Sequence, residues 1–303
     1  MNIETYLNSL VKNKIVIFLL HGVIKKNSHK IRNYNRKHIT KSEFNSFIKG
    51  LSKVGTPVSI GEILKIRNGK KMPQYPFAIT FDDGFRNNLS LALPILVKYE
   101  VPATIYITTD FIDRNRMSWI DRIEWAFEKK KTIKIDLPWR KNKTNISSVK
   151  KKIELLEEIR LFIKKNKYID PNTFADSVQT SLNLPLRYSG QSDLDRKLSW
   201  SEVSFLSSHS SITIGGHTHN HLILSHLSKD ELNYEIGKSL SLIKKNTGKR
   251  VQHYSYPEGL DYTYNKKVIY HLKNKGIICC PSAQHGINSV KTSPFKLKRI
   301  TVI

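Results

Sequence analysis

Short apolar runs alternate with helical patterns along most of the chain, and this alternation constrains the fold more than any other feature. The runs have the length and β-branched content of buried strands, at residues 15–20, 77–81, 103–108, 212–214, 253–256, 277–280 and 297–303. Between them, apolar residues recur at helical spacing over 41–51, 89–99 and 230–245. Strands that alternate with helices form parallel sheets, and at 303 residues a barrel is the common single-domain solution. We therefore predict an α/β chain folded as a (β/α) barrel.

The alternation stops between residues 113 and 197, where we find no clear strand pattern. Residues 147–167 instead carry apolar side chains every three or four positions, as an amphipathic helix does: Val149, Ile153, Leu156, Ile159 and Ile163. We therefore predict one domain over residues 1–303 that is interrupted by a basic, mainly helical insertion at 113–197.

The net charge limits the partners of the chain. Lysine and arginine number 51 against 25 acidic residues, which gives +26. Such an excess predicts attraction to nucleic acid, a membrane surface or an acidic polymer. We expect no nucleic acid, because the chain has no recognised nucleic-acid motif and no basic stripe interleaved with stacking aromatics. Peripheral contact with an anionic membrane through the basic insertion is the expected use of the charge.

The two cysteines bear on the compartment. Cys279 and Cys280 are neighbours in an apolar run, and neighbours on a strand point to opposite faces, so a disulfide between them is sterically poor. Two reduced thiols fit a reducing compartment. The run 15–20 is too short to span a membrane. We expect a cytoplasmic protein, with peripheral contact at the inner membrane face.

Two carboxylates and a glycine follow the predicted strand 77–81, as Asp82, Asp83 and Gly84. The carboxyl ends of barrel strands are where such folds place reactive groups. Adjacent carboxylates repel, so a cation that neutralises one of them would explain the pair. Asp-Asp-Gly is also ordinary turn chemistry, and the residue types alone leave both interpretations open.

Three histidines follow the predicted strand 212–214, as His217, His219 and His221. Histidines at i and i+4 share a face if the chain turns helical, which suits two metal ligands. With one aspartate they form a set that leaves coordination positions open for water and substrate. Further on, Pro257 and Gly259 force a turn that can present a main-chain N–H to a cleft.

These three segments, in this order, resemble the polysaccharide deacetylases of carbohydrate esterase family 4, the nodulation-type deacetylase homology domain. Residues 80–84 resemble the first family motif, 217–221 the second and 256–259 the third. The resemblance covers most of the chain apart from the insertion. It implies a distorted (β/α) barrel and a metal-dependent N-deacetylase, which hydrolyses acetamido groups of a cell-envelope polysaccharide or glycolipid precursor. A non-enzymatic basic protein that binds nucleic acid or anionic membranes is the alternative.

The resemblance also implies roles for single residues. Asp82 would be the general base that deprotonates the water activated by the metal. Asp83, His217 and His221 would hold one divalent metal ion, which is zinc in most members of that family. The N–H of Glu258 would help to stabilise the oxyanion formed when water attacks the acetamide carbonyl.

His219 falls on a variable position of the second motif and is not an expected ligand, whereas Thr218 would steady the histidine loop by hydrogen bonding. A metal-dependent amidohydrolase, with His217 and His219 as a His-x-His pair, is a second enzyme class. That class needs the pair early, on the first strand, so the order of the segments favours the deacetylase.

The chain departs from the family pattern at several positions. Ser255 stands where many members have an arginine that orients the base, and Arg299 is a candidate replacement. No late Leu-His segment supplies a general acid, which leaves His21 and His285 as candidates. Trp119, at the start of the insertion, fits a core tryptophan better than a side chain that stacks on sugar.

Overall fold

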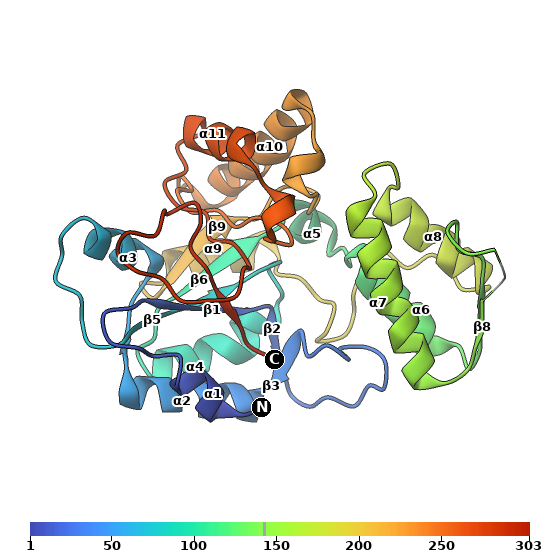
Figure 1. Ribbon diagram of the computed structural model, residues 1–303, viewed down its shortest axis with the longest axis horizontal. Coiled ribbons are helices and arrows are strands. Elements are labelled where there is room, and N and C mark those ends of the chain that lie inside the picture. The colour runs from blue at the N-terminus through green and yellow to red at the C-terminus, as the bar shows by residue number, and fades with distance from the viewer. Residues whose placement is uncertain (142–143) are drawn as a thin grey trace.

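The computed structural model describes residues 1–141 and 144–303, and its centre is a parallel β-sheet (Figure 1). Asn142 and Lys143, within the predicted insertion, lie outside the described residues. The strands lie in the order β10-β1-β5-β6-β9, and β4 pairs with β5. Their bounds are β1 Val16–Leu20, β4 Thr56–Pro57, β5 Pro76–Phe81, β6 Ala103–Ile107, β9 Ile212–Gly216 and β10 Ile300–Thr301. Every pair in this sheet is parallel, as predicted.

The strands of the sheet form one side of the barrel. The other side of this ring is closed by extended segments that form few ladder hydrogen bonds. Single parallel bridges join Gly216 to Tyr254 and His253 to Cys279. The predicted strands 253–256 and 277–280 are therefore reduced to isolated bridges. A proline directly follows each of them, and proline has no N–H with which to extend a ladder. This interruption gives the predicted (β/α) barrel its distorted form.

Helices cover the outside of the ring and confirm the predicted helical patterns. They are α1 Ile3–Leu7, α2 Lys41–Val54, α3 Ile60–Arg67, α4 Leu93–Lys98, α5 Thr109–Arg114, α9 Trp200–Ser208, α10 Lys229–Thr247 and α11 Lys266–Asn274. The pattern 89–99 begins as a π-helical turn, Asn88–Ala92, because Pro94 cannot donate to the Ser90 carbonyl. None of the described helices has both the length and the apolar composition needed to cross a membrane.

The insertion forms a lobe beside the barrel (Figure 1). It contains α6 Trp119–Lys129, a hairpin of β7 Ile133–Ile135 and β8 Thr144–Ile146, α7 Val149–Lys165 and α8 Pro171–Ser181. The helix predicted at 147–167 is confirmed as α7. The hairpin was not predicted, because a three-residue strand is too short to show a period of two. The lobe has its own apolar cluster, in which Leu156, Ile159 and Phe174 are buried.

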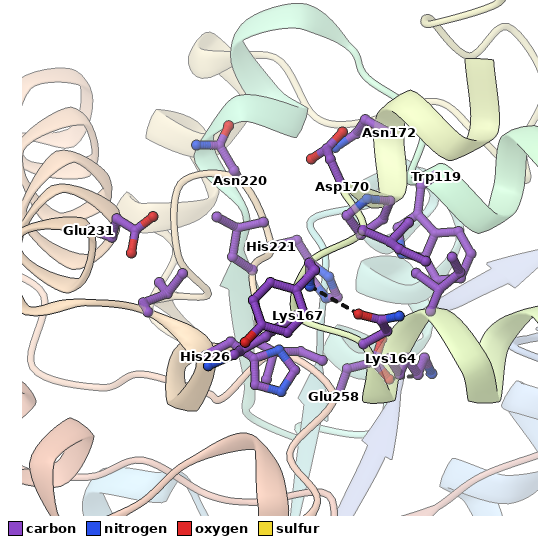
Figure 2. A pocket seen from close by; sticks show the side chains of 18 of the residues that line it. Trp119, Lys164, Lys167, Asp170, Asn172, Asn220, His221, His226, Glu231 and Glu258 are labelled. Carbon is purple, nitrogen blue, oxygen red and sulfur yellow. Dashed lines mark hydrogen bonds and ion pairs between the residues drawn. The ribbon is translucent and has the colours of Figure 1, made fainter. Parts of the chain in front are cut away.

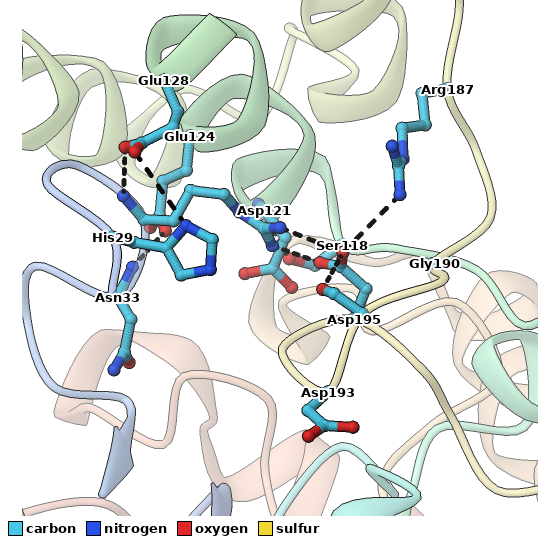
Figure 3. Close-up of polar contacts among 12 residues, drawn as sticks. His29, Asn33, Ser118, Asp121, Glu124, Glu128, Arg187, Gly190, Asp193 and Asp195 are labelled. Atoms are coloured by element: carbon cyan, nitrogen blue, oxygen red, sulfur yellow. Dashed lines mark hydrogen bonds and ion pairs between the residues drawn. The ribbon is translucent and has the colours of Figure 1, made fainter. Parts of the chain in front are cut away.

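Polar contacts join this lobe to the loop that precedes β3 His38–Thr40 (Figure 3). Glu128 accepts hydrogen bonds from three successive backbone N–H groups of that loop, and Glu124 accepts one from the Asn33 N–H. Asp195 forms a buried ion pair with Arg32 of the same loop. These bonds place the first helix of the lobe beside the edge of the barrel where the functional residues lie.

The two cysteines are free and buried. Cys280 packs in the main core, whereas Cys279 packs in a separate cluster with Ile15 and Ile17. Their side chains therefore point to opposite sides of the chain, as predicted for neighbours on a strand.

Candidate active site

The two aspartates leave the end of β5 in different ways. Asp82 is still held to the sheet, because its N–H donates to the Leu20 carbonyl at 3.0 Å. Asp83 has a φ of 75°, in the left-handed region, and the same value recurs at Gly84. A Cβ on Gly84 would lie 3.0 Å from Ile107, so only glycine fits the turn without a shift. The turn carries the chain away while both carboxylates stay at the mouth of the barrel.

The histidine loop follows β9 and lies beside this pair. His217 and His221 would share a face if the chain turned helical here, but the loop is not helical. Left-handed residues at Thr218 and His221, with φ of 67° and 59°, bring the two rings together instead. Thr218 Oγ1 accepts from the His221 N–H at 2.9 Å, which confirms the steadying role predicted for this hydroxyl. His217 Nδ1 lies 2.8 Å from the Ser255 carbonyl, so its Nε2 faces Asp83.

The predicted ligand set is brought together. Asp83 Oδ1 lies 3.3 Å from His221 Nε2 and 3.7 Å from His217 Nε2, and one ligand atom from each residue falls within a 4.8 Å group. Asp83 Oδ1 is buried and accepts no hydrogen bond from the described residues. A buried carboxylate oxygen without a donor is costly unless something else neutralises it. Two imidazole nitrogens around such an oxygen are the donor set of a divalent cation site.

The third histidine points elsewhere. His219 Nδ1 lies 2.8 Å from Thr109 Oγ1, and His219 is not part of the ligand group found among the described residues. The loop backbone at this position is held by Glu235, which accepts from the N–H groups of His219 and Asn220. His219 therefore has a structural place in the loop, in keeping with its variable position in the motif.

A lysine that sequence reasoning missed holds the other oxygen of the same aspartate. Lys37 Nζ lies 3.0 Å from Asp83 Oδ2 and 3.5 Å from Asp121 Oδ2. Burial alone would raise the pKa of Asp83, but the charges of Lys37 and His221 together lower it well below its usual value. Asp83 is thus an anion before any metal binds. No sequence signal marks Lys37, because it lies in a loop far along the chain from the motifs.

Asp82 is held by the predicted replacement arginine. Arg299 donates two hydrogen bonds to the Asp82 carboxylate at 2.9 and 2.8 Å, and a third to Ser255 Oγ at 2.9 Å. Its Nε donates to the Ser282 carbonyl at 2.7 Å, which fixes the guanidinium. Burial would raise the pKa of Asp82, but the charges of Arg299 and His217 lower it. Arg299 therefore lies where it can orient this carboxylate and keep it ionised.

We expect Arg299→Met to lower kcat and to move the acid limb of the pH profile of kcat/KM to higher pH. The buried Asp82 loses the cation that lowers its pKa, so a higher pH is needed to ionise it. A pH–rate profile of the metal-loaded protein checks this, with Arg86→Met as the control because Arg86 pairs with Glu202 away from the site. An unchanged acid limb would show that Arg299 does not act on the base.

The two candidate general acids are separated by the structure. His21 lines the same cavity as Asp82 and Asp83, whereas His285 is exposed and is not among the residues that line it. Burial lowers the pKa of His21 to about 4, so this imidazole is neutral around pH 7 in the metal-free protein. Of the two histidines, only His21 is placed to contact a substrate.

Glu258 lies in a strained turn across the cavity from the aspartates. Its φ is 62°, and a Cβ on the following Gly259, at φ 61°, would lie 2.4 Å from the Ala283 nitrogen. The Glu258 carboxylate pairs with Lys164 Nζ at 2.5 Å. Burial would raise the pKa of Glu258, but Lys164 and His221 outweigh burial and lower it to about 2. The side chain is therefore a fixed anion and no proton donor, while the role of its N–H stays a prediction.

These side chains meet in one cavity of about 290 Å³, which we call the reaction cavity. The barrel contributes most of its wall, and the lobe contributes the rest through residues of α6 and α7. The residues on which the chemistry depends are Asp82, Asp83, His217, His221, Glu258 and His21.

Comparison with known proteins agrees with this geometry. The sequence model of the polysaccharide deacetylase family matches residues 69–279, so the chain belongs to that family, carbohydrate esterase family 4. It is a carbohydrate deacetylase, a hydrolase of carbon–nitrogen bonds. No curated protein matches the chain.

Solved structures show the same fold at low sequence identity. A deacetylase PplD from Streptococcus pyogenes is 15% identical, with a TM-score of 0.61 over 97% of this chain and 94% of its own. IcaB from Ammonifex degensii is 15% identical, with a TM-score of 0.59 over 96% and 92%. A de-N-acetylase from Aggregatibacter actinomycetemcomitans is 16% identical, with a TM-score of 0.59 over 95% and 94%. These similarities support the distorted barrel.

Proposed function

We propose that this protein is a metal-dependent N-deacetylase that removes acetyl groups from acetamido sugars of a cell-envelope polysaccharide or glycolipid precursor. One observation carries the proposal. A buried oxygen of Asp83 that accepts no hydrogen bond from the described residues faces two imidazole nitrogens. The carboxylate of Asp82, which Arg299 holds, lines the same cavity. The family match makes the carbohydrate the substrate class.

Asp83, His217 and His221 would hold one divalent metal ion, and zinc suits their mixed nitrogen and oxygen donors. When bound, the metal supplies Lewis acidity and a water of lowered pKa. The chain itself orients the three ligands before the metal arrives. Ser255 fixes the His217 ring, the Phe111 ring stacks on His221, and Lys37 anchors Asp83.

Proton transfer falls to Asp82 in this proposal. Its carboxylate is ionised and oriented by Arg299, so it can accept the proton of the attacking water. The Glu258 N–H would donate to the oxyanion that develops on the acetamide carbonyl. Of the two candidate histidines, only His21 lines the cavity, and it would have to be protonated first to serve as the acid for the leaving amine.

We propose a cytoplasmic location, with the basic lobe in contact with anionic lipid at the inner membrane face. The free, buried cysteines and the charge of +26 support this assignment. Vesicles with and without anionic lipid would test it, since binding should fall as salt is raised.

Release of acetate tests the proposed reaction. Purified protein loaded with zinc is incubated with N-acetylated glycans, before and after treatment with a chelator. We expect acetate release that the chelator abolishes and added zinc restores. Release that survives complete removal of metal would contradict the metal dependence, and no release from any acetylated glycan would contradict the reaction itself.

A further inference from the structure

A second cavity adjoins the reaction cavity on the side of the lobe, and we call it the side cavity. It encloses about 330 Å³, within the ordinary range of ligand pockets. Figure 2 shows its walls, with Asp170 and Asn172 on the lobe side and Asn220 and His226 on the opposite side. The two cavities share the lining residues Trp119, Lys164, His221 and Glu258.

The ion pair of Lys164 and Glu258 marks the boundary between the two cavities. Lys164 lies at the end of α7 and Glu258 in the turn after Tyr256, so the pair connects the lobe to the barrel. His221, a candidate metal ligand, also lines both cavities. A group bound in the side cavity would therefore contact side chains that also line the reaction cavity.

Two polar groups of the side cavity have no hydrogen-bond partner among the described residues, although the Tyr168 ring contacts Lys167 Nζ. Tyr168 is 86% exposed, and neither its hydroxyl nor the Asn172 amide makes a hydrogen bond to a described residue. Trp119 packs against the apolar cluster of the lobe, as expected for a core tryptophan, but is only partly buried and also lines both cavities. Aromatic faces beside free hydroxyl and amide groups suit a sugar ring, which has apolar faces and hydroxyls at its edge.

The charges of the side cavity favour a neutral ligand. Glu258 neutralises Lys164, and the remaining charged side chains of the lining, Lys167, Asp170 and Glu231, carry a formal charge of −1 in total. The strongly basic character of the whole chain is thus absent at this place. An anionic ligand would find no excess of positive charge in this cavity, whereas an uncharged sugar does not need one.

Another hollow adjoins the side cavity on the side away from the reaction cavity. A third and more open hollow of about 620 Å³ lies over α7, where Trp139 stacks on Phe162 at 3.9 Å between ring centroids. It shares Tyr168 and Lys167 with the side cavity. Tyr168 therefore stands between two hollows that lead in sequence away from the reaction cavity.

We propose that the side cavity is a subsite, built by the lobe, for the neutral sugar next to the one that is deacetylated, and that Tyr168 and Asn172 determine its specificity. This inference rests on the proposed N-deacetylase function. It predicts that a sugar linked to the reacting unit contributes to binding through the lobe rather than through the barrel alone.

The test uses two series of N-acetylglucosamine oligomers, one β-1,4-linked and one β-1,6-linked, each from one to five units. We expect kcat/KM of the zinc-loaded protein to rise between one and three units in at least one series. Tyr168→Ala and Asn172→Ala should each lower kcat/KM for the trimer by about three- to tenfold relative to the single sugar, the size of one lost contact. Tyr270→Ala is the matched control, because Tyr270 is 66% exposed on α11, outside the side cavity.

Two results would overturn the inference. If kcat/KM does not depend on length, or if the trimer-to-monomer ratio is unchanged in Tyr168→Ala and Asn172→Ala, the side cavity is not a sugar subsite, while deacetylation of the single sugar keeps the proposed function. If no oligomer of either series releases acetate, the inference fails, whereas the proposed function fails only if every other acetylated glycan also gives no release.

Discussion

Asp82→Asn is expected to keep one equivalent of metal and to lose nearly all deacetylase activity. Asparagine keeps the shape of the side chain and can still accept a hydrogen bond from Arg299, but it cannot take a proton from water. Loss of general-base action alone typically costs about 10²–10⁴-fold in rate. The neighbouring Asp83 is a poor substitute, because its two oxygens face the histidines and Lys37.

The measurement pairs acetate release with elemental analysis of the same preparation. Arg299 is buried and would lose its ionised partner, so thermal unfolding should be recorded to show that the Asp82→Asn protein is folded. Asp83→Asn is the matched variant and should lose metal. If Asp82→Asn loses metal while Asp83→Asn keeps it, the two aspartates have exchanged roles. Near-normal turnover by Asp82→Asn would remove Asp82 from the mechanism.

Replacing His217 and His221 together by alanine is expected to abolish stoichiometric metal binding, and activity with it. Two of the three candidate ligands are then missing, and a single carboxylate does not hold a transition metal firmly. Single replacements are less decisive, since neighbouring groups can repair part of the loss. Calorimetric titration with zinc and elemental analysis measure the effect directly.

His219→Gln is the control for this pair. It changes a buried histidine of the same loop whose ring bonds Thr109 and lies outside the ligand group. It should keep one equivalent of zinc, which separates loss of a ligand from disturbance of the loop. Unchanged zinc affinity in the His217 and His221 double variant would defeat the ligand assignment.

The candidate metal ligands could be predicted because the fold brings distant segments together in a regular way. Asp83 follows one strand, and His217 and His221 follow another, and the carboxyl ends of parallel strands lie at the same edge of a barrel. Strand ends and ligand chemistry paired the histidines with one of the two adjacent aspartates, and the family resemblance singled out Asp83, 134 positions before His217. The helical turn that would have placed the histidines on one face is absent, and left-handed residues bring the two rings together instead.

Other parts of the site have no sequence signal. Lys37 lies in a loop without a motif, yet it contacts Asp83, and the partner of Asp82 comes from the far end of the chain. From the sequence, Arg299 could be named only as a candidate to replace the arginine that many family members have at the position of Ser255. Whether a guanidinium reaches a carboxylate depends on how the last strand lies against the first, which periodicity does not report.

The sequence by itself determined the alternation of strands and helices, the position of the lobe and the ligand chemistry, because each follows from local residue type and spacing. Tertiary structure alone decided that Lys37 contacts Asp83, that the candidate Arg299 reaches Asp82, and that the lobe forms a wall of two adjoining cavities. The physical reason is the distance along the chain over which each kind of interaction acts. Hydrophobic periodicity and turn chemistry act over a few residues, whereas hydrogen bonds, ion pairs and cavities arise between surfaces that only the folded chain brings into contact.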